Sequence, residues 1–245
     1  TGQATKVSLG SMFKTLSHAV VGLAGTFMIA IRPLMRFVER FANYTDVLAD
    51  ARKTTGLTQE EIEKLSDVLS TLNTRTSQND LMGLVRIAGK LGTEGAANIE
   101  GFTRAADQLV VALKEDLGGD AEEAIRTVGK IVDIFGLKDS LGIEKAMLSV
   151  GSAINELGAS STANEGYIVE FTNRVAGVAP LVKVSAENIM GLAATLDQFG
   201  QTAEVSSTVY SQLMIRMFQD TPTYARLAGL EIKEFNRLLN EDANE

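Results

Sequence analysis

The sequence predicts an all-α fold, arranged as a multi-helix bundle or a solenoid-like array of helices. Apolar residues recur at spacings of three and four along most of the chain, which is the period of one helix face. Tryptophan is absent and aromatic residues make up only 6%, so Leu, Ile, Val, Ala and Met supply the apolar share of 45%. No stretch alternates apolar and polar residues over the length of a strand.

Residues 1–45 are predicted as a separate region, a long apolar and amphipathic helix. Residues 15–31 carry no formal charge and lead directly into an amphipathic stretch rich in arginine. A membrane-spanning helix needs about 20 apolar residues, with ~17 as the lower limit. Two interpretations stay open: a helix buried against partner helices, or contact with a lipid bilayer through residues 12–44.

From residue 46 onward, apolar stripes predict a succession of helices. The stripes lie at 62–72, 81–91, 99–113, 121–135, 143–157, 168–178, 189–199 and 205–217. A terminal pair follows, around Leu227 and from Phe235 to Leu239. The last long stripe consists of Val205, Val209, Leu213, Met214 and Met217.

Start and stop residues agree with these helices. Thr58 with Glu61 fits a capping box, and Asp120 with Glu123 and Thr221 before Pro222 mark further helix starts. Glycines that tolerate a positive φ predict the helix ends. They are Gly56, Gly92, Gly118, Gly136, Gly158 and Gly200.

A short segment occurs twice in the chain, as NIEGFTRAADQ at 98–108 and NIMGLAATLDQ at 188–198. The similarity extends to both sides of this segment. Residues 75–89 resemble 160–177, and residues 121–128 resemble 203–209. The pattern predicts duplication of a unit of roughly four helices, with halves at 46–140 and 141–245. Gly101 and Gly191 share one position, which predicts close helix packing in both copies.

The sequence lacks most of the residue types from which nucleophilic active sites are built. The single histidine, His18, lies in the apolar segment without an acidic partner at helical spacing, and there is no cysteine. Nucleophile–base arrangements for acyl transfer are therefore excluded. The net charge of -8 and the scattered basic residues argue against nucleic-acid binding.

The remaining polar candidates are better explained by structure than by chemistry. Carboxylates at predicted helix starts complement the positive end of the helix dipole. These are Glu60, Glu61, Glu63, Asp116, Asp120, Glu122, Glu123 and Asp242. The turns DLGGD (116–120) and GKLGTEG (89–95) lack the phosphate-loop pattern, and no metal-ligand spacing occurs. Methionines 82, 147, 190, 214 and 217 are predicted as core filler. We expect no catalytic residue, cofactor or metal.

Three motifs carry a family resemblance. They are an S-x-x-(A/Q)-N-(D/E) start of a helix that ends in A-G, the phrase VAGVAPLVKVSAENIMGLAATL, and the downstream A-E-x-x-x-T-V. Over about residues 37–230 the chain resembles the core region of phage tail tape measure proteins, which are minor tail proteins of long-tailed phages. Ser206-Ser207-Thr208 departs from the A-G-T usual in that family, which puts the local turn in doubt.

The resemblance implies a structural, non-enzymatic protein that helps to set tail length during assembly and is expelled when the genome is delivered. The implied partners are further copies of the chain, the tail tube, tail-tip or distal tail proteins and the tail assembly chaperones. The implied location is the lumen or tip of the virion tail, after assembly in the bacterial cytoplasm. On the residues alone, a membrane-inserting helical protein and a generic helical adaptor or scaffold stay open.

Overall fold

The computed structural model describes residues 42–179 and 183–241, and every regular element among them is a helix. This confirms the all-α prediction. The chain divides into two units, Thr1–Val47 and Leu48–Glu245. The predicted apolar segment at 15–31 lies outside the described residues, and a first described helix runs from residue 42 to residue 55.

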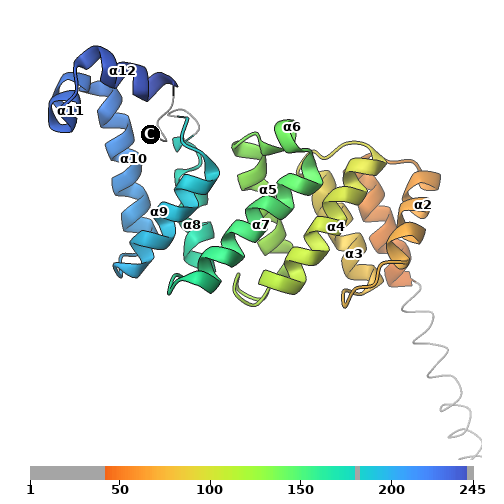
Figure 1. The fold of residues 1–245 in the computed structure, drawn as a ribbon. Coiled ribbons are helices and arrows are strands. Elements are labelled where there is room, and N and C mark those ends of the chain that lie inside the picture. The colour runs from red at the N-terminus through yellow and green to blue at the C-terminus, as the bar shows by residue number, and fades with distance from the viewer. Residues whose placement is uncertain (1–41, 180–182, 242–245) are drawn as a thin grey trace, which may run out of the picture. The chain divides into compact units, whose positions relative to one another are not determined.

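Eleven further helices follow in the second unit (Figure 1). They are α2 (Gln59–Ser70), α3 (Gln78–Lys90), α4 (Ala96–Leu113), α5 (Ala121–Ile134), α6 (Leu137–Leu141), α7 (Ile143–Ser160), α8 (Glu165–Val175), α9 (Ala186–Gln198), α10 (Ala203–Gln219), α11 (Thr221–Ala228) and α12 (Ile232–Glu241).

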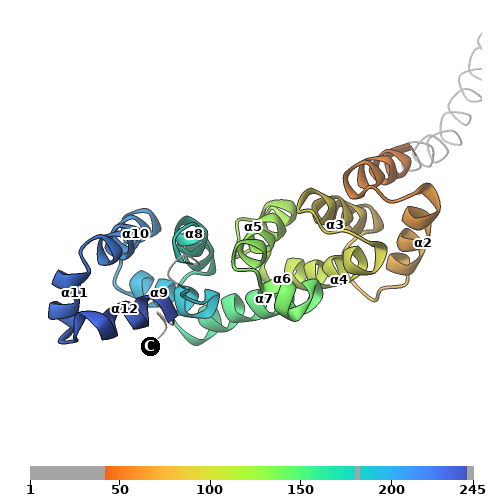
Figure 2. The same ribbon diagram turned by 90° about the horizontal axis from the view of Figure 1, so that it is seen from above.

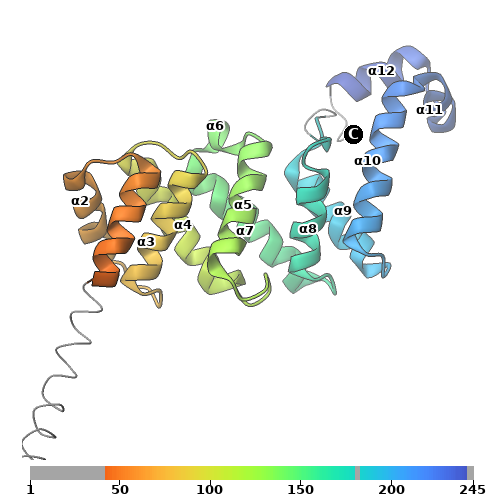
Figure 3. The same ribbon diagram turned by 180° about the vertical axis from the view of Figure 1, so that it is seen from behind.

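The long helices of this unit form two rows. Figure 2 shows α3, α5, α8 and α10 in one row and α4, α7 and α9 in the other. Contacts follow both directions, along each row and between the rows, and the most extensive joins α4 to α7. The core lies between the rows, where Phe102, Met147 and Phe171 are fully buried. Seen from behind, α5 and α8 stand next to each other (Figure 3).

Most predicted helix boundaries are correct. The Thr58–Glu61 capping box is present, and Asp120 caps α5 by accepting from the backbone N–H groups of Glu122 and Glu123. Gly56, Gly92, Gly118, Gly136 and Gly200 all have the positive φ expected after a helix. The fold also contains α6, a five-residue helix that is too short to show a periodic apolar stripe.

One boundary was predicted wrongly. Gly158 does not end a helix, because α7 continues to Ser160. A Cβ at Gly158 would meet the side chain of Glu165, so the glycine permits close approach between α7 and the start of α8. Helix α11 begins at Thr221, directly before Pro222, as predicted, and Asp220 caps it by accepting from the backbone N–H of Thr223. An aspartate carboxylate is a preferred N-cap acceptor.

The paired glycines of the echoed segments lie in different surroundings. A Cβ on Gly101 would lie 3.2 Å from Cβ of Glu144 at the start of α7, which agrees with close packing. A Cβ on Gly191 would have no neighbour within 4 Å. The packing prediction is therefore wrong for Gly191, because among the described residues no helix covers that side of α9 as α7 covers α4.

The two echoed segments do share one tertiary contact. Thr74 donates from its hydroxyl to Asp107 at 2.7 Å, and Asn164 donates from its backbone N–H to Asp197 at 2.7 Å. In both cases the aspartate binds a residue 33 positions earlier, in the segment that leads into the preceding helix. The internal duplication remains a prediction, and this shared contact supports it.

Only part of the apolar stripe predicted for residues 205–217 is buried. Val205, Val209 and Leu213 are exposed, with 53%, 61% and 40% of their surface in solvent. Ala203, Ser206 and Ser207 are the buried residues of α10 instead. Ser206 and Ser207 lie inside this helix, so the departure from the family pattern does not mark a turn. The small serines allow α8 to pack closely, and the larger apolar residues point away.

We predict opposite effects of adding a methyl group at two helical glycines. Gly191→Ala should raise the free energy of unfolding by up to about 1 kcal/mol, because alanine is the better helix former and the site is open. Gly151→Ala should lower it by about 1–3 kcal/mol, because its Cβ would lie 1.9 Å from Leu109 Cδ2. Urea denaturation of both variants checks this; a destabilised Gly191→Ala would show that α9 is covered in solution.

Candidate binding groove between helices α5 and α8

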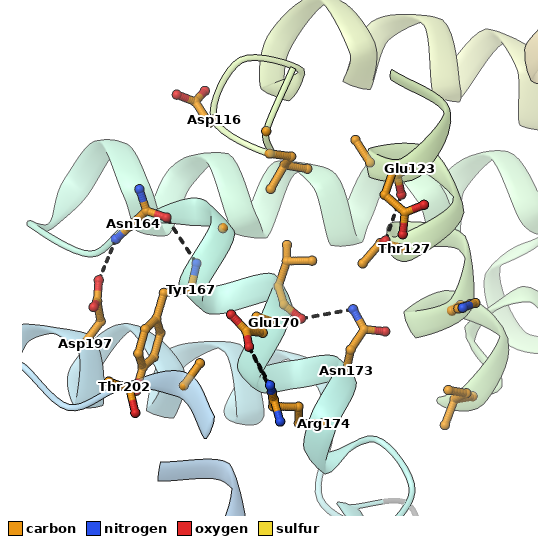
Figure 4. Close-up of a pocket in the computed structure, with 18 residues that line it drawn as sticks. Asp116, Glu123, Thr127, Asn164, Tyr167, Glu170, Asn173, Arg174, Asp197 and Thr202 are labelled. Atoms are coloured by element: carbon orange, nitrogen blue, oxygen red, sulfur yellow. Dashed lines mark hydrogen bonds and ion pairs between the residues drawn. The ribbon is translucent and has the colours of Figure 1, made fainter. Parts of the chain in front are cut away.

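A groove of about 1020 Å³ separates α5 from α8. Its other walls are the loop between α4 and α5, represented by Asp116 to Gly118, and the junction of α9 with α10, represented by Asp197 and Thr202. Figure 4 shows the polar side chains of α8 on one side of this space and those of α5 on the other. The groove thus brings together four helices and one loop.

The α5 wall begins at a turn that only glycines readily form. Gly118 and Gly119 have φ values of 95° and 80°, a region that side-chain-bearing residues rarely occupy. The turn lets the chain reverse into α5, whose first turn places Glu123 at the groove. Glu123 forms an ion pair with Arg126, and its backbone carbonyl accepts from the Thr127 hydroxyl at 2.7 Å. The wall is therefore polar and internally hydrogen-bonded.

The α8 wall depends on its N-cap. The side chain of Asn164 accepts from the backbone N–H of Tyr167 at 3.1 Å, while its own backbone N–H donates to Asp197. A Cβ at the following Gly166 would lie 3.4 Å from the carbonyl oxygen of Asp116. The loop before α5 thus comes close to the start of α8 and closes one end of the groove.

Farther along α8, two polar pairs line the groove. Arg174 donates to Glu170 at 2.9 Å, one helical turn earlier. Asn173 donates from its amide to the carbonyl oxygen of Val169 at 3.0 Å. Both bonds connect residues of the same helix, so these side chains stay on α8 and leave the space toward α5 open (Figure 4).

Aromatic packing fixes α8 against α10. The ring of Phe171 stacks on Tyr167 and also meets Tyr210 of α10, with centroids 6.4 and 6.0 Å apart. The hydroxyl of Tyr167 donates to Ser206 at 3.0 Å. Burial raises the pKa of Tyr210, because a phenolate is poorly solvated between these helices. The groove therefore has one rigid wall.

The lining of the groove carries charged side chains of both signs. Its charged lining consists of Asp116, Glu123, Glu170 and Asp197 against Lys130 and Arg174. The carboxylates of Glu123, Glu170 and Asp197 are held by caps or ion pairs, and the lining contains no histidine or cysteine. Among the described residues there is also no group of acidic or histidine side chains able to hold a metal ion.

The carboxylates named as candidates in the sequence analysis lie on different elements of the structure. Asp116 and Glu123 reach the groove, whereas Glu60, Glu61 and Glu63 lie at the start of α2. Asp120 caps α5, and Glu122 pairs with Arg86 of α3. Asp242 and His18 lie outside the described residues. The structure does not gather these groups into one site.

The methionines and the glycine-rich turns are structural within the described residues. Met82, Met147 and Met190 are fully buried, while Met214 and Met217 are half-buried. The 89–95 turn borders a smaller cavity of about 260 Å³ next to α5 and α6. Sequence reasoning missed the groove residues Asn164, Asn173 and Arg174, although asparagine before a helical stripe is itself a cap pattern.

In the part of the chain that the structure describes, no helix is both long and apolar enough to cross a bilayer.

Comparison with known proteins gives one match. A family described as phage-related minor tail protein matches residues 59–243. No curated protein and no solved structure matches the chain.

The capping box of α2 predicts a pH-dependent contribution to stability. The backbone N–H of Thr58 donates to the Glu61 carboxylate at 2.9 Å and its hydroxyl donates at 2.8 Å, and both bonds lower the pKa of Glu61. A lowered pKa stabilises the folded state above the unfolded value, about 4.3 for glutamate. That stabilisation is lost as the pH falls through the folded pKa.

We expect Glu61→Gln to reduce the free energy of unfolding at neutral pH, and the deficit to shrink as the pH falls below about 4.3. Chemical denaturation across this range measures it. Glu63→Gln is the matched control, because the hydrogen bond to the Glu63 carboxylate comes from the side chain of Gln59 and leaves the N-cap residue Thr58 to Glu61. A deficit that stays constant with pH would contradict the assignment.

Proposed function

This chain belongs to the family of phage-related minor tail proteins, and from that membership we propose that it is the folded helical part of a tape measure protein. The family match over residues 59–243 carries the proposal. As a minor tail protein it is a structural component of the phage tail. The motifs at residues 160–177, 175–196 and 203–209 support the narrower assignment.

Helix lengths support a folded role rather than that of an extended ruler. An unbroken helix of 245 residues would span roughly 370 Å at 1.5 Å per residue. The longest helices of the second unit, α4 and α7, have 18 residues each, or about 27 Å. They pack side by side instead of end to end. We propose that this part anchors the protein within the tail while extended segments set its length.

The surfaces support binding rather than catalysis. The α5–α8 groove is polar at its walls, and the carboxylates of Glu123, Glu170 and Asp197 serve as ion-pair or hydrogen-bond partners. We propose that such surfaces hold the tail tube, tail-tip or distal tail proteins and, during assembly, the tail chaperones. We further propose that several copies lie together in the tail lumen or at its tip, and that the chain has no enzymatic activity.

The first experiment removes the gene from its phage and examines the particles by electron microscopy. Loss of the protein should prevent complete tails, and the intact gene supplied in trans should restore them. An internal deletion of α8 should also abolish assembly instead of shortening the tail in proportion, because α8 packs on four neighbouring helices. Full-length tails in the absence of the gene would contradict the tail role.

Deletion results also separate the narrow proposal from the broad one. If tails form without the protein but vary widely in length, the tape measure role stands and the anchoring role is wrong. If the protein is found in purified virions by mass spectrometry but deletion leaves tail length and number unchanged, it is a minor tail protein with another task.

We also propose a membrane role for residues 12–44 when the genome is delivered. Its support is the uncharged run of residues 15–31. The full chain should release dye from liposomes, and Leu23→Arg should suppress release, since an arginine at the centre of a spanning helix costs about 2.5–3.5 kcal/mol. Val111→Arg, on the exposed face of α4, is the control of equal charge. Equal release by all three proteins would remove the proposed role.

A further inference from the structure

Two blocks of helices meet at the α5–α8 groove. The first block is α2 to α7 (residues 59–160), and the second block is α8 to α10 (residues 165–219). Within the first block, α4 and α7 form the most extensive helix pair of the described chain, and Arg86 of α3 pairs with Glu122 of α5. These interactions hold the helices of the first block together.

The second block is held together by its own contacts. Helix α8 packs extensively on both α9 and α10. The Tyr167 hydroxyl donates to Ser206 of α10, and the backbone N–H of Asn164 donates to Asp197 of α9. Toward the first block, α8 touches α5 and α7 over shorter stretches. The joint is therefore less extensive than the packing that holds α8 to its own block.

Along α8, no polar bond crosses the joint. Helices α5, α7 and α8 are described over their whole length, and no hydrogen bond or ion pair joins α5 or α7 to α8. The charged side chains of the two walls pair within their own helix, Glu123 with Arg126 on α5 and Glu170 with Arg174 on α8. A change in the width of the groove therefore breaks none of these bonds.

The short connection between α7 and α8 is where the chain passes from the first block to the second. Its hydrogen bonds are local: the Ser161 hydroxyl donates to the carbonyl oxygen of Leu157 and accepts from the backbone N–H of Ala163. The second block also touches α7 through α9, whose buried residues are three alanines, one isoleucine and one methionine. Small sliding of packed helices is a common form of domain motion, and short or flexible side chains suit it.

Two side chains of the α5 wall would gain partners if the groove narrowed. Ile134 lines the groove and is 44% exposed. Lys130, one turn earlier, also lines the groove and has no ion-pair partner in the part of the chain that the structure describes. In Figure 4 both α5 and α8 lead away from the end of the groove where Asp116 lies. Narrowing would therefore cover part of Ile134 and bring Lys130 toward Glu170 of the facing wall.

We propose that the second block swings against the first about the α7–α8 connection, so that the α5–α8 groove alternates between an open form and a closed form. The structure in Figure 4 is the open form. In the closed form Ile134 is covered, and Lys130 pairs with Glu170. A molecule that occupies the groove stabilises the open form, because a ligand shifts an equilibrium toward the state that binds it. The motion belongs to the chain itself and does not rest on the function proposed above.

Distances between spin labels test the swing in the full chain, which contains no cysteine of its own. Asn79→Cys on α3 with Gln212→Cys on α10 spans the joint. Asn79→Cys with Val111→Cys lies within the first block, Glu187→Cys with Gln212→Cys lies within the second, and all four positions are exposed. Double electron–electron resonance should give a broader distance distribution for the spanning pair than for either control. Equal widths for all three pairs overturn the proposal and leave the tail role untouched.

Charge reversal at the groove tests the closed form with the same spanning pair. Lys130→Glu should lower the ratio of closed to open molecules by about threefold, because it replaces an attraction between exposed charges with a repulsion. Adding Glu170→Lys should restore the ratio. Lys90→Glu, at an exposed position of α3, is the matched control and should leave the distribution unchanged. Unchanged circular dichroism shows that the variants fold. A distribution that does not respond to Lys130→Glu, or that responds equally to Lys90→Glu, overturns the proposal.

Discussion

The contact between α4 and α7 is the interaction on which the rest of the structure depends. It joins the helices of the first half to those of the second, and it is the most extensive helix pair in the described part of the chain. Leu109 fills the space that Gly151 leaves open, and Gly101 lets the start of α7 approach α4. Most of the stability of a helix in a protein comes from packing its apolar face on a neighbour, and for α4 that neighbour is chiefly α7. Without this contact the row of α4, α7 and α9 (Figure 2) would be interrupted between α4 and α7.

The same rows position the α5–α8 groove. Polar side chains within α5 and α8, together with the caps at the starts of these helices, supply the polar walls. Asn164 holds the start of α8, Asp197 holds Asn164, and the Gly118–Gly119 turn brings the preceding loop to the groove. Three of the groove carboxylates, those of Glu123, Glu170 and Asp197, thus already serve structural bonds. This agrees with membership in a family of tail proteins.

The last helix in a row of packed helices has one side that the row itself does not cover. Interior helices such as α5 and α7 pack on neighbours on both sides. Helix α10 packs extensively on α8 alone, and its contacts with α9 and α11 are few. The C-terminal pair α11 and α12 buries its own small cluster, with Ala225, Phe235 and Leu239 at its centre. That pair shields Met217 but leaves Val205 and Val209 in solvent. An exposed apolar stripe of this kind is a common mark of an assembly surface.

The sequence by itself determined the helical class, most helix boundaries and the absence of catalytic residue types, because periodicity, caps and composition are local properties. Thr58, Asp120 and Gly136 act locally, and their roles followed from the residues around them. Only the tertiary structure decided which apolar faces are buried. The stripe at Val205 and the glycine at Gly191 resemble core positions along the chain, yet no helix in residues 42–179 or 183–241 covers them. The groove likewise arises from residues up to 87 positions apart, from Asp116 to Ala203, and burial depends on such long-range neighbours rather than on spacing alone.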